Sequence, residues 1–327
     1  MTRLALVFLM LVAGVFVLAG CGGDDDGGGA GGDDVELTQE KDVTIAMVTH
    51  GDGGSFWSVA KKGAEDAAKD LGVTLKYNES NNDAEAQAQM IETSVTEGVD
   101  GLAVSAPDPE AIRSAVQTAV DAGIPVITLN SGAEESAELG AITHVGQTET
   151  IAGRGAGERL NEEGASKMIC IIHEQGNVGL NQRCEGAAET FGGDVENLQV
   201  AGTSDVSTTL TEIQSKLESD QAIDAVLALN PDIAVAARDA VAGAGSEATV
   251  ATFDLSSDVI SAIEAGEILF AIDQQQYLQG YLPVVFLTLN KTNLNTVGGG
   301  QPVLTGPGFV DKSNAAEVKE LAEAGTR

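Results

Sequence analysis

The sequence predicts an α/β protein with two doubly wound parallel-sheet lobes of the Rossmann-like kind. Three observations carry this prediction. The chain has 327 residues, which is long for a single domain of about 150 residues. Short apolar runs alternate with amphipathic helical stripes, and this alternation is typical of parallel strands covered by helices on both faces. The alternation breaks near residue 146 and then restarts, which indicates a second unit of the same kind.

The first unit opens with an apolar strand at 43–49 and a helix at 58–71, in which Val59, Gly63 and Ala67 recur at four-residue steps. Further strands are predicted at 73–77, 101–104 and 124–129. Further helices are predicted at 84–97 and 109–122, each with its apolar residues on one face.

The second unit repeats this order. Its strands are predicted at 167–172, 198–201, 225–229, 249–253 and 269–272. Its helices are predicted at 180–191, 208–219, 233–242 and 258–264, followed by a long apolar helix around 279–289. Because ligands of open α/β sheets bind beyond the carboxyl ends of the strands, the residues that follow each strand are the candidate site.

The N-terminus indicates export. Arg3 precedes an apolar run at 4–19, which is shorter than the ~20 residues of a spanning helix and fits the core of a signal peptide. The run ends in Leu-Ala-Gly-Cys, which resembles the lipobox of bacterial lipoproteins. We therefore expect residues 1–20 to be a lipoprotein signal peptide and Cys21 to carry the lipid; a plain signal peptide or a short anchor is the alternative. Residues 21–42 are rich in Gly and Asp, so we expect an extended tether.

The excess of acidic residues argues against some classes of binding partner. The chain has 17 Lys and Arg against 50 Asp and Glu, a formal net charge of −33. This argues against nucleic acid, whose phosphates need a basic surface, and disfavours strongly anionic ligands.

The cysteines and histidines indicate no metal. Once Cys21 is assigned to lipid, Cys170 and Cys184 remain, an even pair in an exported protein. They form either a disulfide or two buried free thiols. With three His in the chain, we expect no metal site.

Aromatic side chains are scarce, so an adjacent pair is informative. Phe56 and Trp57 lie at a glycine-rich turn after the first strand, where two neighbouring rings are hard to bury together. We expect them to stack on the apolar face of a sugar; the alternative is that one ring caps the core. His50 and Asp52 belong to the same turn.

Polar residues follow the other strands. They are Ser105, Asn130, Ser131, His173, Glu174, Asn230, Asp254, Asp273 and Gln274, with Arg183 in the first turns of the next helix. Each has a structural alternative as a helix cap or an ion pair. Residues 173–177 lack the final His of HExxH, and GxSxG, GxxxxGK[ST] and CxxC motifs are absent. The set favours recognition, with no catalysis and no cofactor.

Seven segments together carry a family resemblance. The chain resembles the ribose-binding-protein-like branch of type I periplasmic solute-binding proteins over about 43–325. The segments are 55–73, 100–112, 123–133, 183–191, 224–232, 252–256 and 270–280.

The resemblance implies a fold and a function. Such proteins bind a sugar between two lobes joined by a three-strand hinge and present it to the permease of an ABC importer. It implies crossings near 146, 275 and 303. The N-terminal lobe would then be 43–146 plus 275–303, and the C-terminal lobe 147–274 plus 304–327.

The resemblance also implies site residues. Phe56 and Trp57 match stacking aromatics, and Arg183 matches an arginine that bonds sugar hydroxyls. Further polar ligands would be Asn130, Asn230, Asp254 and Gln274. The chain departs from the ribose pattern at Gly54, Ser105 and Ser131, which leaves a different pentose, a hexose or a sugar alcohol open. Replacement contacts would come from His50, Asp52 or Glu174. Ser105, Ser131 and Asp273 are further candidate ligand residues.

The leading hypothesis is therefore an exported, lipid-anchored, monomeric receptor for a small neutral sugar or polyol, held at the outer face of the cell membrane or in the periplasm. The first alternative is a receptor that hands a sugar-like autoinducer or another small molecule to a sensor. The second is an enzyme on a Rossmann-like sheet, which the missing catalytic motifs disfavour. A repressor is disfavoured because an export signal stands where a DNA-binding headpiece would.

Overall fold

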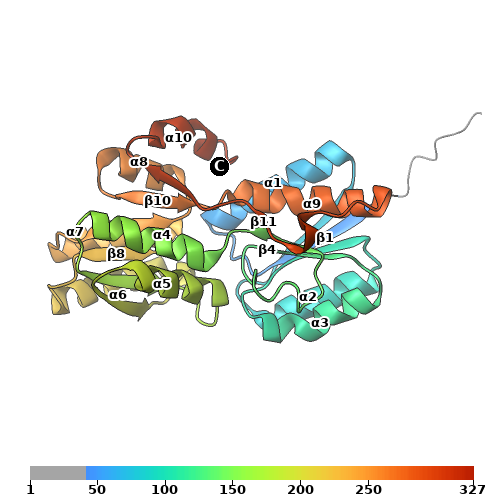
Figure 1. Ribbon diagram of the computed structural model, residues 1–327, viewed down its shortest axis with the longest axis horizontal. Coiled ribbons are helices and arrows are strands. Elements are labelled where there is room, and N and C mark those ends of the chain that lie inside the picture. Colours follow the sequence, from blue (N-terminus) through green and yellow to red (C-terminus); the bar gives the residue numbers. More distant parts are fainter. Residues whose placement is uncertain (1–41) are drawn as a thin grey trace, which may run out of the picture. The chain divides into compact units, whose positions relative to one another are not determined.

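The computed structural model describes residues 42–327. The predicted signal peptide, Cys21 and nearly all of the predicted tether lie outside the described residues. The described chain forms two six-stranded sheets, each covered by helices on both faces (Figure 1). We call the two sheets with their helices the N-lobe and the C-lobe.

The N-lobe sheet has the order β11-β5-β4-β3-β1-β2, and every neighbouring pair is parallel. Its strands are β1 (Thr44–Thr49), β2 (Thr74–Glu79), β3 (Gly101–Ser105), β4 (Val126–Leu129), β5 (Thr143–Gly146) and β11 (Val303–Leu304). Helices α1 (Ser55–Leu71) and α9 (Gln276–Asn293) pack on one face, and α2 (Ala84–Thr96) and α3 (Pro109–Asp121) on the other (Figure 1). A short η2 (Gly298–Gly300) precedes β11.

Two glycines allow α1 and α9 to cross closely. A Cβ on Gly63 would lie 2.1 Å from the carbonyl oxygen of Tyr277, and one on Gly280 would lie 1.8 Å from that of Ala60. Each helix therefore presents a glycine to the backbone of the other, and any larger residue would force the two helices apart.

The C-lobe sheet has the order β12-β10-β9-β8-β6-β7. Its strands are β6 (Lys167–Ile172), β7 (Asp194–Gln199), β8 (Ala225–Ala228), β9 (Thr249–Phe253), β10 (Phe270–Asp273) and β12 (Gly308–Asp311). Only β12 pairs antiparallel with its neighbour within this sheet. Helices α4 (Glu149–Glu162) and α5 (Val178–Thr190) cover one face. The opposite face carries α6 (Val206–Ser219), α7 (Pro231–Ala244), α8 (Ser257–Ala265) and α10 (Ala315–Glu323), with η1 (Thr203–Asp205) before α6.

The chain passes between the two sheets three times. The connections run from β5 to α4, from β10 to α9 and from β11 to β12. The crossings predicted near 146, 275 and 303 lie at or beside these connections. Gln275, in the second connection, has a φ of 56° and a backbone N–H that donates to Asp273 Oδ1 at 2.7 Å.

The predicted elements differ from those of the structure in two ways: one strand was misplaced, and several elements were missed. The strand predicted at 198–201 is β7 at Asp194–Gln199; it lies at the sheet edge with its charged residues exposed, so no apolar run reveals it. Five elements were not predicted: β5, α4, β11, β12 and α10. In α4 the buried stripe includes Ala152, Gly153, Ala156 and Gly157, small residues that give little helical hydrophobic signal.

Cys170 in β6 and Cys184 in α5 form a disulfide. It joins β6, the strand next to the edge strand of the C-lobe sheet, to the helix that carries Arg183. None of the helices described over 42–327 is long and apolar enough to cross a membrane.

Candidate functional site

Two neighbouring cavities lie between the lobes, at the carboxyl ends of the strands. The inner cavity has a volume of about 30 Å³. It is lined by His50, Phe56, Trp57, Asn130, Ser131, His173, Glu174, Asn177, Leu180, Arg183, Leu229, Asn230, Asp254 and Gln274. The outer cavity has a volume of about 350 Å³, and His50, His173, Glu174 and Asn177 line both. Ten of the thirteen predicted ligand residues therefore line the inner cavity together, and the three exceptions are described below.

The aromatic pair is buried, contrary to expectation. Phe56 and Trp57 are each 4% exposed and belong to the N-lobe core. Their rings meet edge to face with centroids 5.0 Å apart, and His50 meets Trp57 edge to face at 4.8 Å. Both rings fit because Gly51 lacks a Cβ, which would lie 2.9 Å from Trp57 Cγ. The pair nevertheless forms one wall of the inner cavity.

Amide side chains form the next wall. Asn130 has a φ of 61°, a left-handed conformation that Asn tolerates. Its Nδ2 donates to Gln279 Oε1 at 3.3 Å, and Gln279 Nε2 donates to Gln274 Oε1 at 2.8 Å. Ser131 Oγ lies 3.1 Å from Asn130 Oδ1 and 3.2 Å from Asn177 Oδ1 of the C-lobe. These bonds fix the orientation of Asn130 at the junction of the two lobes.

Arg183 is buried and paired, whereas the alternative considered from sequence was a surface ion pair. Its Nε and Nη2 donate to the two carboxylate oxygens of Glu149 at 2.6 and 3.0 Å. Its Nη1 donates to the carbonyl oxygen of Leu229 at 3.2 Å, and its guanidinium lies 4.5 Å from the ring centroid of Phe253. Three of the five N–H donors of a guanidinium are thus taken, which leaves two for a ligand.

Asp254 faces Arg183 without a direct ion pair. It has a φ of 69° and accepts a hydrogen bond from Gln274 Nε2 at 2.7 Å. Burial raises the pKa of the Asp254 carboxyl to about 7, against the opposing charge of Arg183 and the Gln274 hydrogen bond. Because Glu149 shares the charge of Arg183, the arginine only partly offsets that burial.

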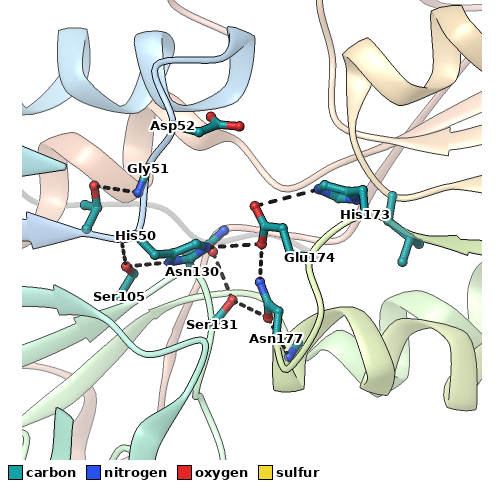
Figure 2. Close-up of polar contacts among 12 residues, drawn as sticks. His50, Gly51, Asp52, Ser105, Asn130, Ser131, His173, Glu174 and Asn177 are labelled. Carbon is teal, nitrogen blue, oxygen red and sulfur yellow. Dashed lines mark hydrogen bonds and ion pairs between the residues drawn. The ribbon is translucent and has the colours of Figure 1, made fainter. Parts of the chain in front are cut away.

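A histidine–glutamate contact crosses the boundary between the lobes (Figure 2). His50 Nδ1 lies 2.7 Å from Ser105 Oγ, and His50 Nε2 lies 3.6 Å from Glu174 Oε2. Asn177 Nδ2 donates to Glu174 Oε2 at 2.6 Å. Burial would raise the pKa of Glu174, but His50, His173 and Asn177 together hold it below its ordinary value. Burial also lowers the pKa of His173.

Four predicted site residues lie outside the inner cavity or use their side chains in other hydrogen bonds. Asp52 lines only the outer cavity, and Ser105 bonds His50 without lining either cavity. Asp273 also lines neither: its carboxylate accepts from the Gln275 backbone and from Arg327 Nε at 2.6 Å. Asn230 lines the inner cavity but uses its side-chain oxygen to cap α7 at Asp232 N, 2.8 Å away.

Direct hydrogen bonds join the two lobes. Asp52 accepts from Thr203 Oγ1, and Asp232 accepts from Ser55 Oγ at 3.1 Å. The Val178 backbone N–H donates to the carbonyl oxygen of Pro107 at 2.9 Å. Because the inner cavity of about 30 Å³ is far below the ~300–1,000 Å³ of ordinary ligand pockets, a sugar ring can enter it only if these contacts open.

Three contributing residues escaped the sequence reasoning: Glu149, Asn177 and Gln279. Each lies on a helix or at its start, where acids and amides are common for local reasons. Their partners are distant in sequence, so only the fold shows the contacts. Over residues 42–327, no group of His, Cys, Asp and Glu is arranged to hold a metal ion.

Comparisons with known proteins bear on this geometry. The sequence model of a family described as a periplasmic binding protein domain matches residues 45–289. The ribose import binding protein of Haemophilus influenzae is 28% identical over 246 residues, which cover 74% of this chain and 83% of that protein.

Solved structures of sugar-binding proteins are also similar to this chain. The crystal structure of a carbohydrate transporter from Acidothermus cellulolyticus 11B, in complex with myo-inositol, is 45% identical with a TM-score of 0.86, covering 88% of this chain and all of that one. The Caulobacter myo-inositol binding protein shares the fold at 22% identity and a TM-score of 0.76, covering 86% of this chain and 98% of that one. The predicted fold class is thereby confirmed. The chain belongs to the periplasmic binding protein family, whose relatives here are substrate-binding proteins of transporters and not enzymes.

Proposed function

We propose that this protein is the substrate-binding lipoprotein of an ABC importer and captures a monosaccharide or sugar alcohol between its two closing lobes. The inner cavity is the observation that carries this proposal. It places two aromatic rings from one lobe opposite carboxylate, amide and guanidinium groups from the other. Rings cover the C–H face of a sugar, and planar polar groups bond its hydroxyls.

The charges around the cavity favour a neutral ligand. Among the residues that the structure describes, Arg183 is the only Lys or Arg that lines it, and Glu149 already pairs with that arginine. Asp254 and Glu174 line the same cavity. A phosphate or carboxylate on the ligand would meet acidic groups with no free cation to offset them, so hydroxyl groups are the better match.

The relatives indicate which probes to use first. The Acidothermus cellulolyticus structure contains myo-inositol, and the Haemophilus influenzae relative is named for ribose import. We propose a neutral ring polyol as the leading class, with pentoses and hexoses next. In this proposal, ligand capture is a hinge motion that makes and breaks the direct contacts between the lobes.

A thermal-shift screen tests the ligand class. The full-length chain is purified in a detergent without a sugar headgroup and screened against myo-inositol, D-ribose, D-galactose, xylitol and a set of amino acids. A ligand at 100 times its dissociation constant should add about 2.7 kcal/mol of stability. We expect a shift with a sugar or polyol. A shift with amino acids alone would contradict the proposed ligand class.

Matched variants locate the binding. Asp254→Asn should reduce the shift, because Asp254 lies in the inner cavity wall. Asp239→Asn is the control, since Asp239 is exposed on α7 and pairs only with neighbouring Arg238. Equal shifts in the two variants would place the ligand elsewhere.

The lipid anchor has its own test. Cys21→Ser should abolish incorporation of labelled palmitate in cells and release the protein from membranes. Incorporation that persists in the variant would contradict lipidation at Cys21. The outcome is independent of the ligand screen.

A further inference from the structure

The outer cavity is large enough to hold a sugar ring of its own. Its volume of about 350 Å³ lies within the ~300–1,000 Å³ range of small-molecule sites. It adjoins the inner cavity, and His50, His173, Glu174 and Asn177 form a shared wall between the two. Figure 2 shows how these side chains meet at the boundary of the lobes.

Both lobes contribute polar groups to the outer cavity. The N-lobe supplies Asn81 and Asn82, and the C-lobe supplies Gln175, Thr203 and Ser204. The cavity is therefore completed only when the lobes are together, as a ligand site between closing lobes must be. Residues that line both sides can bond one ligand at once.

Two asparagines present unused amides at a fixed position. Asn81 and Asn82 have φ values of 52° and 60°. Their backbone N–H groups donate to the carbonyl oxygens of Gly51 at 2.8 Å and His50 at 3.0 Å. Within the described chain, neither side-chain amide makes a hydrogen bond. Consecutive non-glycine residues in the left-handed region are uncommon and cluster at ligand sites.

The charged residues that line the outer cavity favour a neutral ligand. Asp52, Asp108 and Glu174 line the outer cavity, and no Lys or Arg within 42–327 does. Phosphorylated or carboxylated groups are disfavoured there for the same reason as in the inner cavity. Amides and hydroxyls are the groups that a neutral polyhydroxylated ring would bond.

The shared wall can accept a bridging oxygen. His50 Nε2 and Glu174 Oε2 lie 3.6 Å apart, beyond the distance of a direct hydrogen bond. A ligand oxygen between the cavities could bond one or both of them. A two-ring ligand that spans both cavities could therefore replace the contact between His50 and Glu174.

We infer that the outer cavity is a second sugar subsite and that the ligand is a disaccharide or a glycoside of a polyol. One ring would occupy the inner cavity once the lobes have opened enough to widen it beyond its present volume of about 30 Å³, and a second neutral, polyhydroxylated ring would occupy the outer one. This inference rests on the proposed function and narrows its ligand class.

Calorimetric titration of the full-length chain, in a detergent without a sugar headgroup, tests the inference. The two-ring probes are the α-galactoside of myo-inositol, trehalose, maltose, cellobiose and lactose, and the single rings are myo-inositol, D-glucose and D-galactose. We expect at least one two-ring probe to bind ten times more tightly than either of its component rings.

A cavity-filling variant locates the second ring. Ser204→Trp should remove the tenfold advantage of the two-ring probe and leave the affinity for a single ring within twofold. Ser207→Trp is the matched control, because Ser207 lies three residues further on and lines a different surface hollow. Asn82→Gly removes one amide while keeping a residue suited to the positive φ, and it should also reduce the advantage. Unchanged melting temperatures establish that all three variants fold.

The outcomes separate this inference from the proposed function. If a single ring binds and no two-ring probe binds more tightly, the second subsite is refuted and the proposed function stands. If Ser204→Trp weakens one-ring and two-ring probes equally, the outer cavity is not a separate subsite. If no one-ring or two-ring probe binds, the proposed sugar-binding function fails and the subsite fails with it.

Discussion

Replacing Glu149 with leucine should destabilise the C-lobe strongly. Glu149 and Arg183 join α4 to α5 through two hydrogen bonds of 2.6 and 3.0 Å, and their side chains are 1% and 4% exposed. Glu149→Leu leaves the guanidinium buried without a direct ion pair, with the Leu229 carbonyl, the Phe253 ring and the facing Asp254 carboxyl as its remaining partners. Removing one partner of a buried ion pair costs about 3–5 kcal/mol, because the other charge stays buried without compensation.

The expected change is large enough for simple thermal melts. A domain of 150–250 residues loses about 2–4 °C per kcal/mol, so the transition of the C-lobe should fall by roughly 6–20 °C. Circular dichroism of the full-length chain measures it. The double variant Glu149→Leu/Arg183→Met removes both charges and should recover most of the loss, since apolar replacement of a buried pair is often nearly neutral.

The same two helices provide a control. Arg154 on α4 and Glu189 on α5 form an ion pair with side chains 46% and 49% exposed. Glu189→Leu should cost less than about 1 kcal/mol, because exposed pairs contribute little. If Glu149→Leu melts within 1 °C of Glu189→Leu, the argument that Arg183 depends on Glu149 is refuted.

Three further predictions follow from other contacts. Asp254 has a folded pKa of about 7 against about 3.9 when unfolded, so it holds more protons in the folded state and stability should fall as pH rises from 4 to 7. The melting temperature of the unmodified protein minus that of Asp254→Asn should therefore decrease over this window, and a constant difference would count against the shift. Asp232→Asn removes the C-lobe carboxylate bonded to Ser55 of the N-lobe and should weaken sugar binding about two- to tenfold; an unchanged dissociation constant by calorimetry would exclude this contact from closure. Cys170 and Cys184 are separated by 14 residues, so the double alanine variant should lose about 3 kcal/mol in urea unfolding, and equal stability would show that the bond contributes nothing.

Periodicity predicted most of the fold because buried strands are locally apolar. The strand predicted at 167–172 coincides with β6. It is apolar after its first residue and lies inside the sheet. The edge strand β7 was misplaced because its exposed positions include Asp194, Glu196 and Asn197, which give no apolar run. A local apolar pattern reveals a strand most clearly where both of its faces are covered.

The site could be predicted in position more than in detail. The rule that ligands bind beyond the carboxyl ends of strands led to Asn130, Asp254 and Gln274, which line the inner cavity. It also led to Asp273, which instead pairs with Arg327, far away in sequence. Side-chain partners of this kind depend on how distant segments pack, and no local pattern reports them.

The buried aromatic pair shows a second limit. We expected Phe56 and Trp57 to be hard to bury together, because they are adjacent at a glycine-rich turn after a strand. Both are 4% exposed, since Trp57 packs beside His50 and the bare backbone of Gly51. The rings act as core and cavity wall together, so the two interpretations weighed from the sequence were not exclusive.

The sole tryptophan of the chain tests the central claim directly. Trp57 lines the inner cavity, and no other tryptophan contributes to the emission. Titration of the full-length chain with myo-inositol, ribose and the two-ring probes should give a saturable change in tryptophan fluorescence that fits one site and is weakened in Asp254→Asn. If calorimetry detects sugar binding while Trp57 emission stays constant, or if Asp254→Asn responds like the unmodified protein, the sugar does not bind between the lobes as we propose.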